Sequence, residues 1–507
     1  MKTIKFYFAI FLIFVSVNQI AAQSAAQKLN DYFTALETDK NINGNVLIAD
    51  NNQIVYRKSF GMADFENGKP NDEKTVFQFD SISKTVTAVA VLQLKEKSKL
   101  NLDDKFVKYF PEFPYPEVSI RQMLSHTSGV PNDNIFQETV TKNPDRVIVN
   151  EDIIPEMKPG KFPLLFQPGT KWSYSNLNFY LLATLVEKLT GEKFENYLQK
   201  NIFAPAKMKT AFVKTTLINS AHRTDEAYYY DYPYLYSTDR VRITDTFSLS
   251  RFKIEYYNLY GMDGAGSIKG TTDDLYKFDQ ALYNGTLLKA ATVEEMLTPI
   301  KLNNGESAVA DLGGVLKTSF GLGWFILNDT SKGKIVGHTG GRYGSQTMFL
   351  RNLDKNQAVI FFDNGESEGV YRNALSALNI LNGEPILVQP KSLAKIYGRA
   401  LIEKGADYAA ARLLELKTDT KNFRLSESRM NVLGYELFAN GYTSQSLETF
   451  KLITLLFPES WNAYDSYGEA LMKSGKRDEA KIMYKKSVEL NPKNEAGKKM
   501  LEQLSKQ

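Results

Sequence analysis

The chain has 507 residues, 43% of them hydrophobic and 24% charged, with a formal net charge of +4 at pH 7. A chain of this length predicts more than one domain, because a single hydrophobic core rarely grows beyond about 300 residues. The small net charge argues against nucleic acid or a membrane surface as a partner, and the absence of cysteine excludes thiol catalysis, disulfides and thiolate metal sites.

The first 23 residues are predicted to be a secretory signal peptide. Lys2 and Lys5 precede a mostly apolar run over residues 6–17, and small residues follow it. This run is shorter than the roughly 20 apolar residues that a membrane-spanning helix needs. We therefore expect an exported chain, periplasmic or secreted, that is soluble and has no membrane span once the leader is removed.

Residues 28–380 show the alternation of strands and helices that is typical of one mixed domain. Residues 43–59 predict a β-hairpin, and residues 81–96 predict a helix with almost no polar face, which we expect to be buried. Further elements are predicted downstream: a helix over residues 178–188 and strands over residues 333–336, 347–350 and 358–362.

Residues 381–390, with a glycine and two prolines, are predicted to be a linker, and the pattern beyond them changes to paired helices. Gly398, Gly434 and Gly468 lie 36 and 34 residues apart, and each is followed by leucine three residues later. This period resembles the tetratricopeptide repeat, so residues 391–507 are predicted to form helical repeats. Two interpretations stay open: a surface for a protein partner, and a helical cap with no partner.

Ser81-Ile82-Ser83-Lys84 places a serine and a lysine three residues apart at the start of the apolar helix. Residues at this spacing share a helix face, so Oγ of Ser81 and the amine of Lys84 can meet. A serine becomes a nucleophile when a base takes its proton, and a lysine serves as base where its surroundings favour the neutral form. The alternative is a capping serine beside a solvated lysine.

Two polar triplets follow. Tyr174-Ser175-Asn176 leads into the second predicted helix; a tyrosine beside a cation can pass protons, and an asparagine amide can bind a substrate carbonyl or amide. His338-Thr339-Gly340 follows a predicted strand and offers a polar edge that can hold a carboxylate, with glycine letting a substrate approach the backbone.

In this order the three motifs resemble the S-x-x-K, Y-x-N and [KH]-T-G set of serine β-lactamases, DD-peptidases and related esterases. Three further segments, residues 124–129, 167–170 and 320–324, also resemble sequences of this family. The resemblance covers about residues 28–380. It implies an α+β fold, in which helices flank an antiparallel sheet, a helical subdomain lies beside it and the site lies between them.

The resemblance also implies catalytic roles. It implies that Ser81 is acylated, that Lys84 and Tyr174 share proton transfer, and that Asn176 orients the substrate amide. The backbone N–H groups of Ser81 and Gly341 are implied as the oxyanion hole.

The third motif is implied to recognise the substrate rather than to react. By the resemblance, His338 and Thr339 bind the far end of the substrate, beside Gly340 and Gly341. His338 stands where β-lactamases of this group commonly carry lysine, and a histidine here resembles some DD-carboxypeptidases and D-amino-acid peptidases.

Two residues depart from the family pattern, and one motif is a decoy. Asp80 stands before the nucleophile, where a small residue is usual, and either pairs with Lys84 or faces solvent. Arg342 follows the glycine pair and is a candidate carboxylate clamp. Gly365-Glu366-Ser367-Glu368-Gly369 is formally G-x-S-x-G, but no histidine follows it, so Ser367 is predicted to be a turn residue.

The remaining candidates have structural explanations. His126 is expected to be a structural hydrogen-bonding residue, and His222 is expected on the surface. Nine tyrosines occur between Tyr228 and Tyr260, where they form either an aromatic rim of the cleft or the packing of a long insertion. No H-E-x-x-H or comparable cluster is present, so neither a metal nor another cofactor is expected.

The motifs restrict the mechanism more than the substrate. The first hypothesis is an exported serine hydrolase, a D-amino-acid peptidase, DD-carboxypeptidase-like enzyme or esterase, acting on small acyl or peptide substrates, with peptidoglycan-derived peptides as one candidate. A true β-lactamase is the second. The third is a non-hydrolysing penicillin-binding or scaffold protein that works through its repeats; the intact motif residues argue against it.

Overall fold

The computed structural model describes residues 25–143, 146–158, 160–214, 223–243, 261–312, 314–327 and 332–505. They fall into two compact units. The first unit runs to Asp231 and resumes over Arg242–Leu387, and the second comprises Tyr232–Val241 and Val388–Gln507. The short segment of the second unit interrupts the first in sequence, an arrangement that the sequence did not predict.

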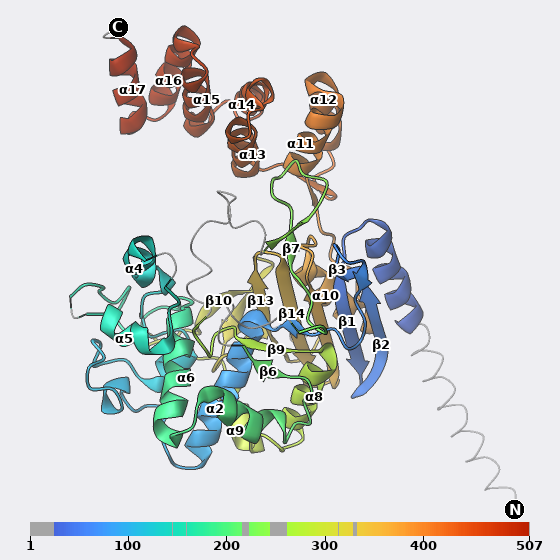
Figure 1. The fold of residues 1–507 in the computed structure, drawn as a ribbon, viewed down its shortest axis with the longest axis vertical. Coiled ribbons are helices and arrows are strands. Elements are labelled where there is room, and N and C mark those ends of the chain that lie inside the picture. The colour runs from blue at the N-terminus through green and yellow to red at the C-terminus, as the bar shows by residue number, and fades with distance from the viewer. Residues whose placement is uncertain are drawn as a thin grey trace, which may run out of the picture. The chain divides into compact units, whose positions relative to one another are not determined.

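The first unit is built on an antiparallel sheet of eight strands in the order β10-β11-β12-β13-β14-β15-β1-β2 (Figure 1). Strands from both ends of the unit meet in it, because β1 pairs with β15 from Gly44↔Asp363 to Ala49↔Ala358. Its strands are β1 (Gly44–Asp50), β2 (Gln53–Phe60), β10 (Val309–Leu312), β11 (Leu316–Phe320), β12 (Phe325–Leu327), β13 (Ile335–Arg342), β14 (Ser345–Asn352) and β15 (Gln357–Asp363).

The strand alternation divides the apolar residues between two cores, one on each face of the sheet. Val46 and Ile48 of β1 pack with the helix over residues 25–38 and with α10 (Val370–Leu381). Leu47 and Ala49 join the other core, which contains α2 (Ser83–Glu96), α6 (Asn176–Thr190) and α8 (Thr272–Tyr283).

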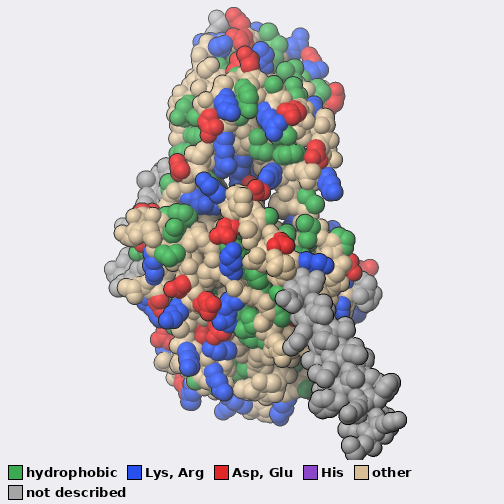
Figure 2. Space-filling view, turned by 90° about the vertical axis from the view of Figure 1, so that its right-hand side faces the viewer, with side chains coloured by type: hydrophobic (Ala, Val, Ile, Leu, Met, Phe, Trp, Pro, Cys, Tyr) green, Lys and Arg blue, Asp and Glu red, His purple; other side chains and the backbone are tan. Residues whose placement is uncertain are grey.

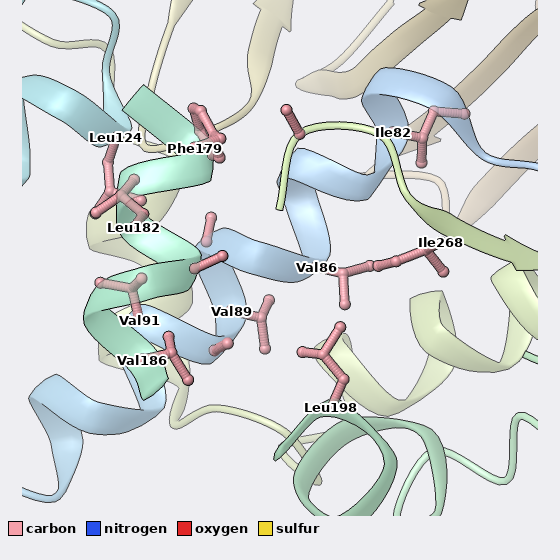
Figure 3. Close-up of a cluster of buried hydrophobic side chains, with 14 of the residues drawn as sticks. Ile82, Val86, Val89, Val91, Leu124, Phe179, Leu182, Val186, Leu198 and Ile268 are labelled. Carbon is pink, nitrogen blue, oxygen red and sulfur yellow. The ribbon is translucent and has the colours of Figure 1, made fainter. Parts of the chain in front are cut away.

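Helix α2 is the centre of that second core. Its side chains from Ser83 to Leu94 are all buried, as its nearly continuous apolar sequence predicts. Figure 3 shows Val86, Val89 and Val91 of α2 among side chains of α6 and beside Leu198, which lies in the helix after α6. Burial of the first turn of α2 shields Lys84 of the serine–lysine motif from solvent.

Shorter elements complete the first unit. They are β3 (Met62–Asp64) with β4 (Lys69–Pro70); β5 (Phe77–Gln78), β9 (Ile268–Gly270) and β6 (Phe212–Val213) in one small sheet; and helices α3 (Ile120–Leu124), α4 (Gln137–Lys142), α5 (Ile153–Glu156), α7 (Phe194–Leu198) and α9 (Ala290–Met296). The short strands β7 (Tyr230–Asp231) and β8 (Val241–Arg242) pair where the chain passes from one unit to the other and back. The small sheet positions the segment after Gly264 against α2, since Thr87 Oγ1 donates to the Gly264 carbonyl at 2.7 Å.

The second unit is helical. Its helices are α11 (Leu393–Lys404), α12 (Ala406–Leu416), α13 (Glu427–Ala439), α14 (Thr443–Leu456), α15 (Trp461–Lys473), α16 (Arg477–Leu490) and α17 (Glu495–Ser505), with β16 (Lys391–Ser392) and β17 (Phe423–Arg424) forming a short parallel pair. The repeated glycines allow close helix crossing: a Cβ on Gly434 would lie 2.6 Å from Phe450 Cζ, and one on Gly468 would lie 3.2 Å from Tyr484. These paired helices are compatible with the predicted repeat, which stays a prediction.

The predicted elements agree with the observed ones in kind, and their ends differ. The hairpin is confirmed as β1–β2, and the two helices as α2 and α6. The strand expected over residues 333–336 instead begins at Ile335 and continues to Arg342, because Gly333 takes a left-handed turn with φ of 96°. The third motif therefore lies within a strand and not after one.

The surface agrees with the modest net charge. In the face shown in Figure 2, basic and acidic side chains of the described residues are interspersed. Within the described ranges, the helices fall short of the length and apolar character that a bilayer crossing requires. Nor do the acidic residues and histidines of those ranges gather in groups of three or more that could hold a metal ion.

Candidate active site

Ser81 lies in a single 3₁₀ turn, Asp80–Ile82, that leads directly into α2. Asp80 takes a left-handed conformation with φ of 49°, so the chain bends sharply just before the serine. Oγ of Ser81 lies 3.2 Å from Nζ of Lys84, one turn later. The helical spacing therefore brings the two groups within hydrogen-bond distance, as the sequence predicts.

Lys84 is held in surroundings that favour its neutral form. Its side chain is completely buried, and Nζ donates to the Ala265 carbonyl at 2.8 Å. Burial lowers the pKa of Lys84 from 10.5 to about 7, although the charges of Asp133 and Asp80 oppose this change. Near neutral pH a large fraction of Lys84 is thus an amine able to accept the Ser81 proton.

Tyr174 lies next to both Ser81 and Lys84. The side chain of Ser81 lowers the pKa of the Tyr174 hydroxyl, and the ring centroid of Tyr174 lies 4.8 Å from Nζ of Lys84. Burial raises the pKa of Tyr174 above its ordinary value of 10.0. Tyr174 is therefore a neutral phenol at physiological pH, able to hold and pass a proton beside the nucleophile.

Asn176 is the first residue of α6, and its orientation is set by a loop that the sequence did not single out. Its Nδ2 donates to Oδ2 of Asp133 at 2.8 Å, and its backbone N–H donates to Oδ1 of Asn132 at 2.9 Å. Burial raises the pKa of Asp133, while the hydrogen bond from Asn176 and the charge of Lys84 oppose that rise. Asp133 links the second motif to the serine–lysine pair electrostatically.

The third motif lies on β13. Its glycines and Thr339 lie near the nucleophile turn, whereas His338 is buried in the interior. Gly340 comes so close to the nucleophile turn that a Cβ there would lie 2.7 Å from the Phe79 carbonyl and 2.2 Å from Thr347 Oγ1. Gly341 is exposed and lines a cavity together with Ser81. Thr339 is partly buried beside them on the strand.

His338 belongs to the interior. It is 1% exposed, its Nδ1 lies 2.6 Å from the Thr339 carbonyl, and its ring centroid lies 5.0 Å from that of Phe325 and 6.3 Å from that of Tyr174. Burial lowers the pKa of His338 to about 3. The buried, uncharged ring lies beside Tyr174, and the expected role of His338 at the far end of a substrate stays a prediction.

A cavity of about 640 Å³ opens beside Ser81. Its volume is in the range of pockets that enclose small molecules. Its polar lining includes Asp133, Asn176, Lys214, Gly341 and Arg342, and apolar side chains such as Phe136, Val140 and Leu165 complete it. The nucleophile thus faces a space that fits a small acyl or peptide substrate.

The sequence of this unit matches a known family: residues 29–381 match the beta-lactamase family model. The chain belongs to the beta-lactamase family. It is 31% identical to penicillin-binding protein 4* of Bacillus subtilis (strain 168) over 435 residues, which cover 83% of this chain and 91% of that protein. The α+β fold predicted for this part, an antiparallel sheet with flanking helices, is confirmed, and the protein is a serine hydrolase of this family.

Solved structures share the fold. A penicillin-binding protein from Bacillus halodurans is similar with a TM-score of 0.56 at 25% identity, covering 69% of this chain and 99% of that one. The D-amino acid amidase of Ochrobactrum anthropi SV3 is similar with a TM-score of 0.56 at 22% identity, covering 71% of this chain and 97% of that one.

Asp80 and Arg342, the two departures from the family pattern, are partners of one another. Arg342 Nε donates to Asp80 Oδ1, and Ser345 Oγ donates to Asp80 Oδ2 at 2.7 Å. Asp80 is 2% exposed, so the predicted solvent-facing alternative is wrong. The hydrogen bonds of its carboxylate go to Arg342 and Ser345, while its charge raises the pKa of Lys84. A buried carboxylate needs such partners, and their positions 262 residues apart hid the pair from sequence analysis.

His126 supports the family's tyrosine motif. The residue is completely buried, and its ring centroid lies 4.4 Å from that of Tyr174. Its Nδ1 accepts a hydrogen bond from the Ser175 backbone at 3.2 Å, and burial lowers its pKa well below 6.5. The predicted structural role of His126 fits these contacts. His222 lies outside the described residues, and so does the part of the tyrosine-rich segment at residues 244–260.

Ser367, the serine of the decoy motif, occupies a turn after β15. Its backbone N–H donates to Oδ1 of Asp363 at 3.0 Å, and Glu366 before it has φ of 50°. Its hydroxyl is buried with no hydrogen-bond partner in the described part of the chain. These surroundings agree with the predicted turn role of Ser367.

Proposed function

We propose that the protein hydrolyses amide or ester bonds of small D-amino-acid-containing substrates through an acyl-enzyme on Ser81. The observation that carries this proposal is the pair of Ser81 Oγ and Lys84 Nζ, 3.2 Å apart, in which complete burial of the lysine side chain lowers its pKa to about 7. A base with a pKa near the working pH is the most effective proton acceptor for a nucleophile.

The first step transfers one proton. Lys84 takes the hydroxyl proton of Ser81 while Oγ attacks the substrate carbonyl, and the carbonyl electron pair moves to its oxygen. The backbone N–H groups of Ser81 and Gly341, both at the cavity, are proposed to stabilise that oxyanion; removal of one such donor typically costs about 10²-fold in rate. The substrate amide lies against Asn176, whose side chain Asp133 orients.

Collapse of the intermediate needs a proton on the leaving group. Tyr174 is proposed to deliver it, since its neutral phenol interacts with Ser81 and its ring centroid lies 4.8 Å from Nζ of Lys84. Lys84 then returns its proton to Tyr174. Water attacks the acyl-enzyme by the same steps in reverse order, and Ser81 is released.

A peptidase or amidase is favoured over a β-lactamase by the chemistry around His338. Lysine is common at this position in β-lactamases of the group, whereas His338 is buried and its lowered pKa leaves it neutral. The relatives named penicillin-binding protein and D-amino acid amidase are in line with this choice. A cavity of about 640 Å³ suits a short peptide or an amino-acid amide.

Export is the setting in which such a hydrolase meets peptidoglycan-derived peptides. The predicted leader, residues 1–23, lies outside the described residues. Its charge pattern and apolar run support secretion into the periplasm or medium. Mass spectrometry of the protein recovered from its native host tests this: a chain that starts near residue 24 is expected, and a full-length chain retained in the cytoplasm contradicts it.

The substrate class is tested by comparing the two stereoisomers of alanine p-nitroanilide and a cephalosporin reporter. We expect kcat/KM for the D-isomer to exceed that for the L-isomer by at least about tenfold, which corresponds to ~1.4 kcal/mol of transition-state discrimination. Rapid turnover of the cephalosporin with neither anilide cleaved would instead identify a β-lactamase. Lys84→Ala is the control, since its turnover must vanish for every substrate that uses this site.

A further inference from the structure

Residues 232–241 lie, in sequence, within the hydrolase domain, yet they pack into the helical unit. The centre of the segment is Leu235, which is 3% exposed. It is part of the main apolar cluster of that unit, together with Tyr397, Leu401, Leu433, Leu437 and Phe450. A side chain from outside the repeat sequence thus completes the core formed by helices α11, α13 and α14.

Polar groups of the helices bind the backbone of the segment. The backbone N–H of Leu235 donates to Oε2 of Glu436 at 2.7 Å. Nε of Arg399 donates to the Ser237 carbonyl at 3.0 Å. Recognition of backbone groups by side chains, next to an apolar anchor, is the way a protein surface binds a peptide.

Aromatic contacts surround this anchor. The ring of Tyr236 stacks on that of Tyr234 at 5.2 Å between centroids and meets the edge of Tyr442 at 5.7 Å. The Tyr232 ring lies 5.1 Å from the guanidinium of Arg399. Tyrosine and arginine at the centre of a contact are typical of residues that contribute most to binding.

The repeat itself is irregular where the segment binds. In the second repeat Phe450 covers Gly434, and in the third repeat Tyr484 covers Gly468; each aromatic residue follows its glycine by 16 positions. In the first repeat the residue 16 positions after Gly398 is Leu414, and its side chain is 45% exposed. A Cβ on Gly398 would instead lie 2.8 Å from Leu433 and 3.2 Å from Tyr236, so the segment helps to cover this glycine.

We propose that the helical unit binds residues 232–241 of its own chain as an internal peptide ligand. The surface that α11 and α13 offer is occupied by this segment, and a separate protein that requires the same surface must displace it. The helical residues from 388 onward are accordingly an incomplete module, because part of their core comes from residues 232–241, which lie far before them in sequence.

The test uses the full chain and hydrogen–deuterium exchange of α11 and α13. In Leu235→Asp we expect exchange in these helices to accelerate by at least about tenfold, because a buried carboxylate replaces the anchor. Leu455→Asp, the same change at a residue that is 71% exposed, is the matched control and is expected to leave the exchange unchanged. Unchanged ester turnover in both variants verifies that the hydrolase domain is folded.

A second variant tests the ligand character directly. Residues 232–241 are replaced by ten glycine and serine residues, and a synthetic peptide with the native sequence of that segment is added to the variant. Restored protection of α11 and α13 on titration with the peptide supports the proposal. Two results would show that the segment is not a ligand of the helical unit. One is that α11 and α13 exchange at the same rate in Leu235→Asp and Leu455→Asp. The other is that α11 and α13 stay protected in the glycine–serine variant and gain no protection from the peptide.

Discussion

Replacement of Lys84 by methionine is expected to abolish catalysis and at the same time to stabilise the protein. The pKa of Lys84 is lowered by burial from 10.5 to about 7, and each unit of difference corresponds to ~1.4 kcal/mol. Holding this lysine in the native site therefore costs about 5 kcal/mol where the native amine is charged. The Ala265 carbonyl loses its donor in the variant, at a cost of ~1–3 kcal/mol, so a net gain of about 2–4 kcal/mol is expected.

The gain in stability of Lys84→Met must become smaller as the pH rises. As pH falls from 10.5, the unfolded chain takes up a proton on Lys84, whereas the native state does so only near pH 7. The cost is therefore complete below about pH 7 and disappears as pH rises towards 10.5. Lys84→Met should stabilise strongly at pH 6 and much less at pH 9.5.

Chemical denaturation at these two pH values, with ester turnover measured in parallel, is the assay. Lys99→Met is the control, because it removes the same charge from an exposed position just beyond α2. A Lys84→Met protein that is less stable than wild type at pH 6, or equally stabilised at both pH values, would refute the explanation that burial keeps this lysine neutral.

Three further substitutions test the surroundings of the nucleophile. Tyr174→Phe should lower kcat by about 10²-fold or more with a smaller change in KM, measured with a nitrophenyl ester; an unchanged kcat excludes the proposed proton carrier. Asp80→Asn should lower the Tm in calorimetry, because loss of one partner from a buried ion pair costs ~3–5 kcal/mol, and the added change Arg342→Met should recover part of it. His338→Gln should change kcat/KM by the same factor for a D-Ala-D-Ala peptide and for a neutral ester, since the buried ring is uncharged; a selective loss on the peptide would instead support the recognition role.

Much of the fold and the central pair of the site could be predicted because they depend on local sequence. The distance from Ser81 to Lys84 follows from one helical turn, and the burial of α2 follows from its uninterrupted apolar run. The strand pattern likewise predicts the β1–β2 hairpin, whose turn at Asn51 and Asn52 uses two residues that tolerate positive φ.

The remaining features depend on contacts between distant segments, which one sequence does not reveal. The ring of His338 lies among those of Phe320, Phe325 and Tyr174, and the motif alone, which indicated substrate binding, did not reveal this burial. Asp133 carried no motif, and its link to Asn176 appears only when the loop before α4 meets α6. The tyrosine-rich segment stands out by its composition, but it lies far from the repeats in sequence, so the repeat period does not reveal that Leu235 belongs to the helical core.

The central claim is that Ser81 carries the acyl group, and intact-protein mass spectrometry with a fluorescent penicillin tests it most directly. The wild-type chain and Ser367→Ala should each gain one penicilloyl adduct, mapped by peptide digestion to residue 81, and Ser81→Ala should gain none. Ser81 has Lys84 at 3.2 Å, whereas the hydroxyl of Ser367 is buried without a hydrogen-bond partner among the described residues. An adduct that persists in Ser81→Ala, or that is lost in Ser367→Ala, would contradict the account.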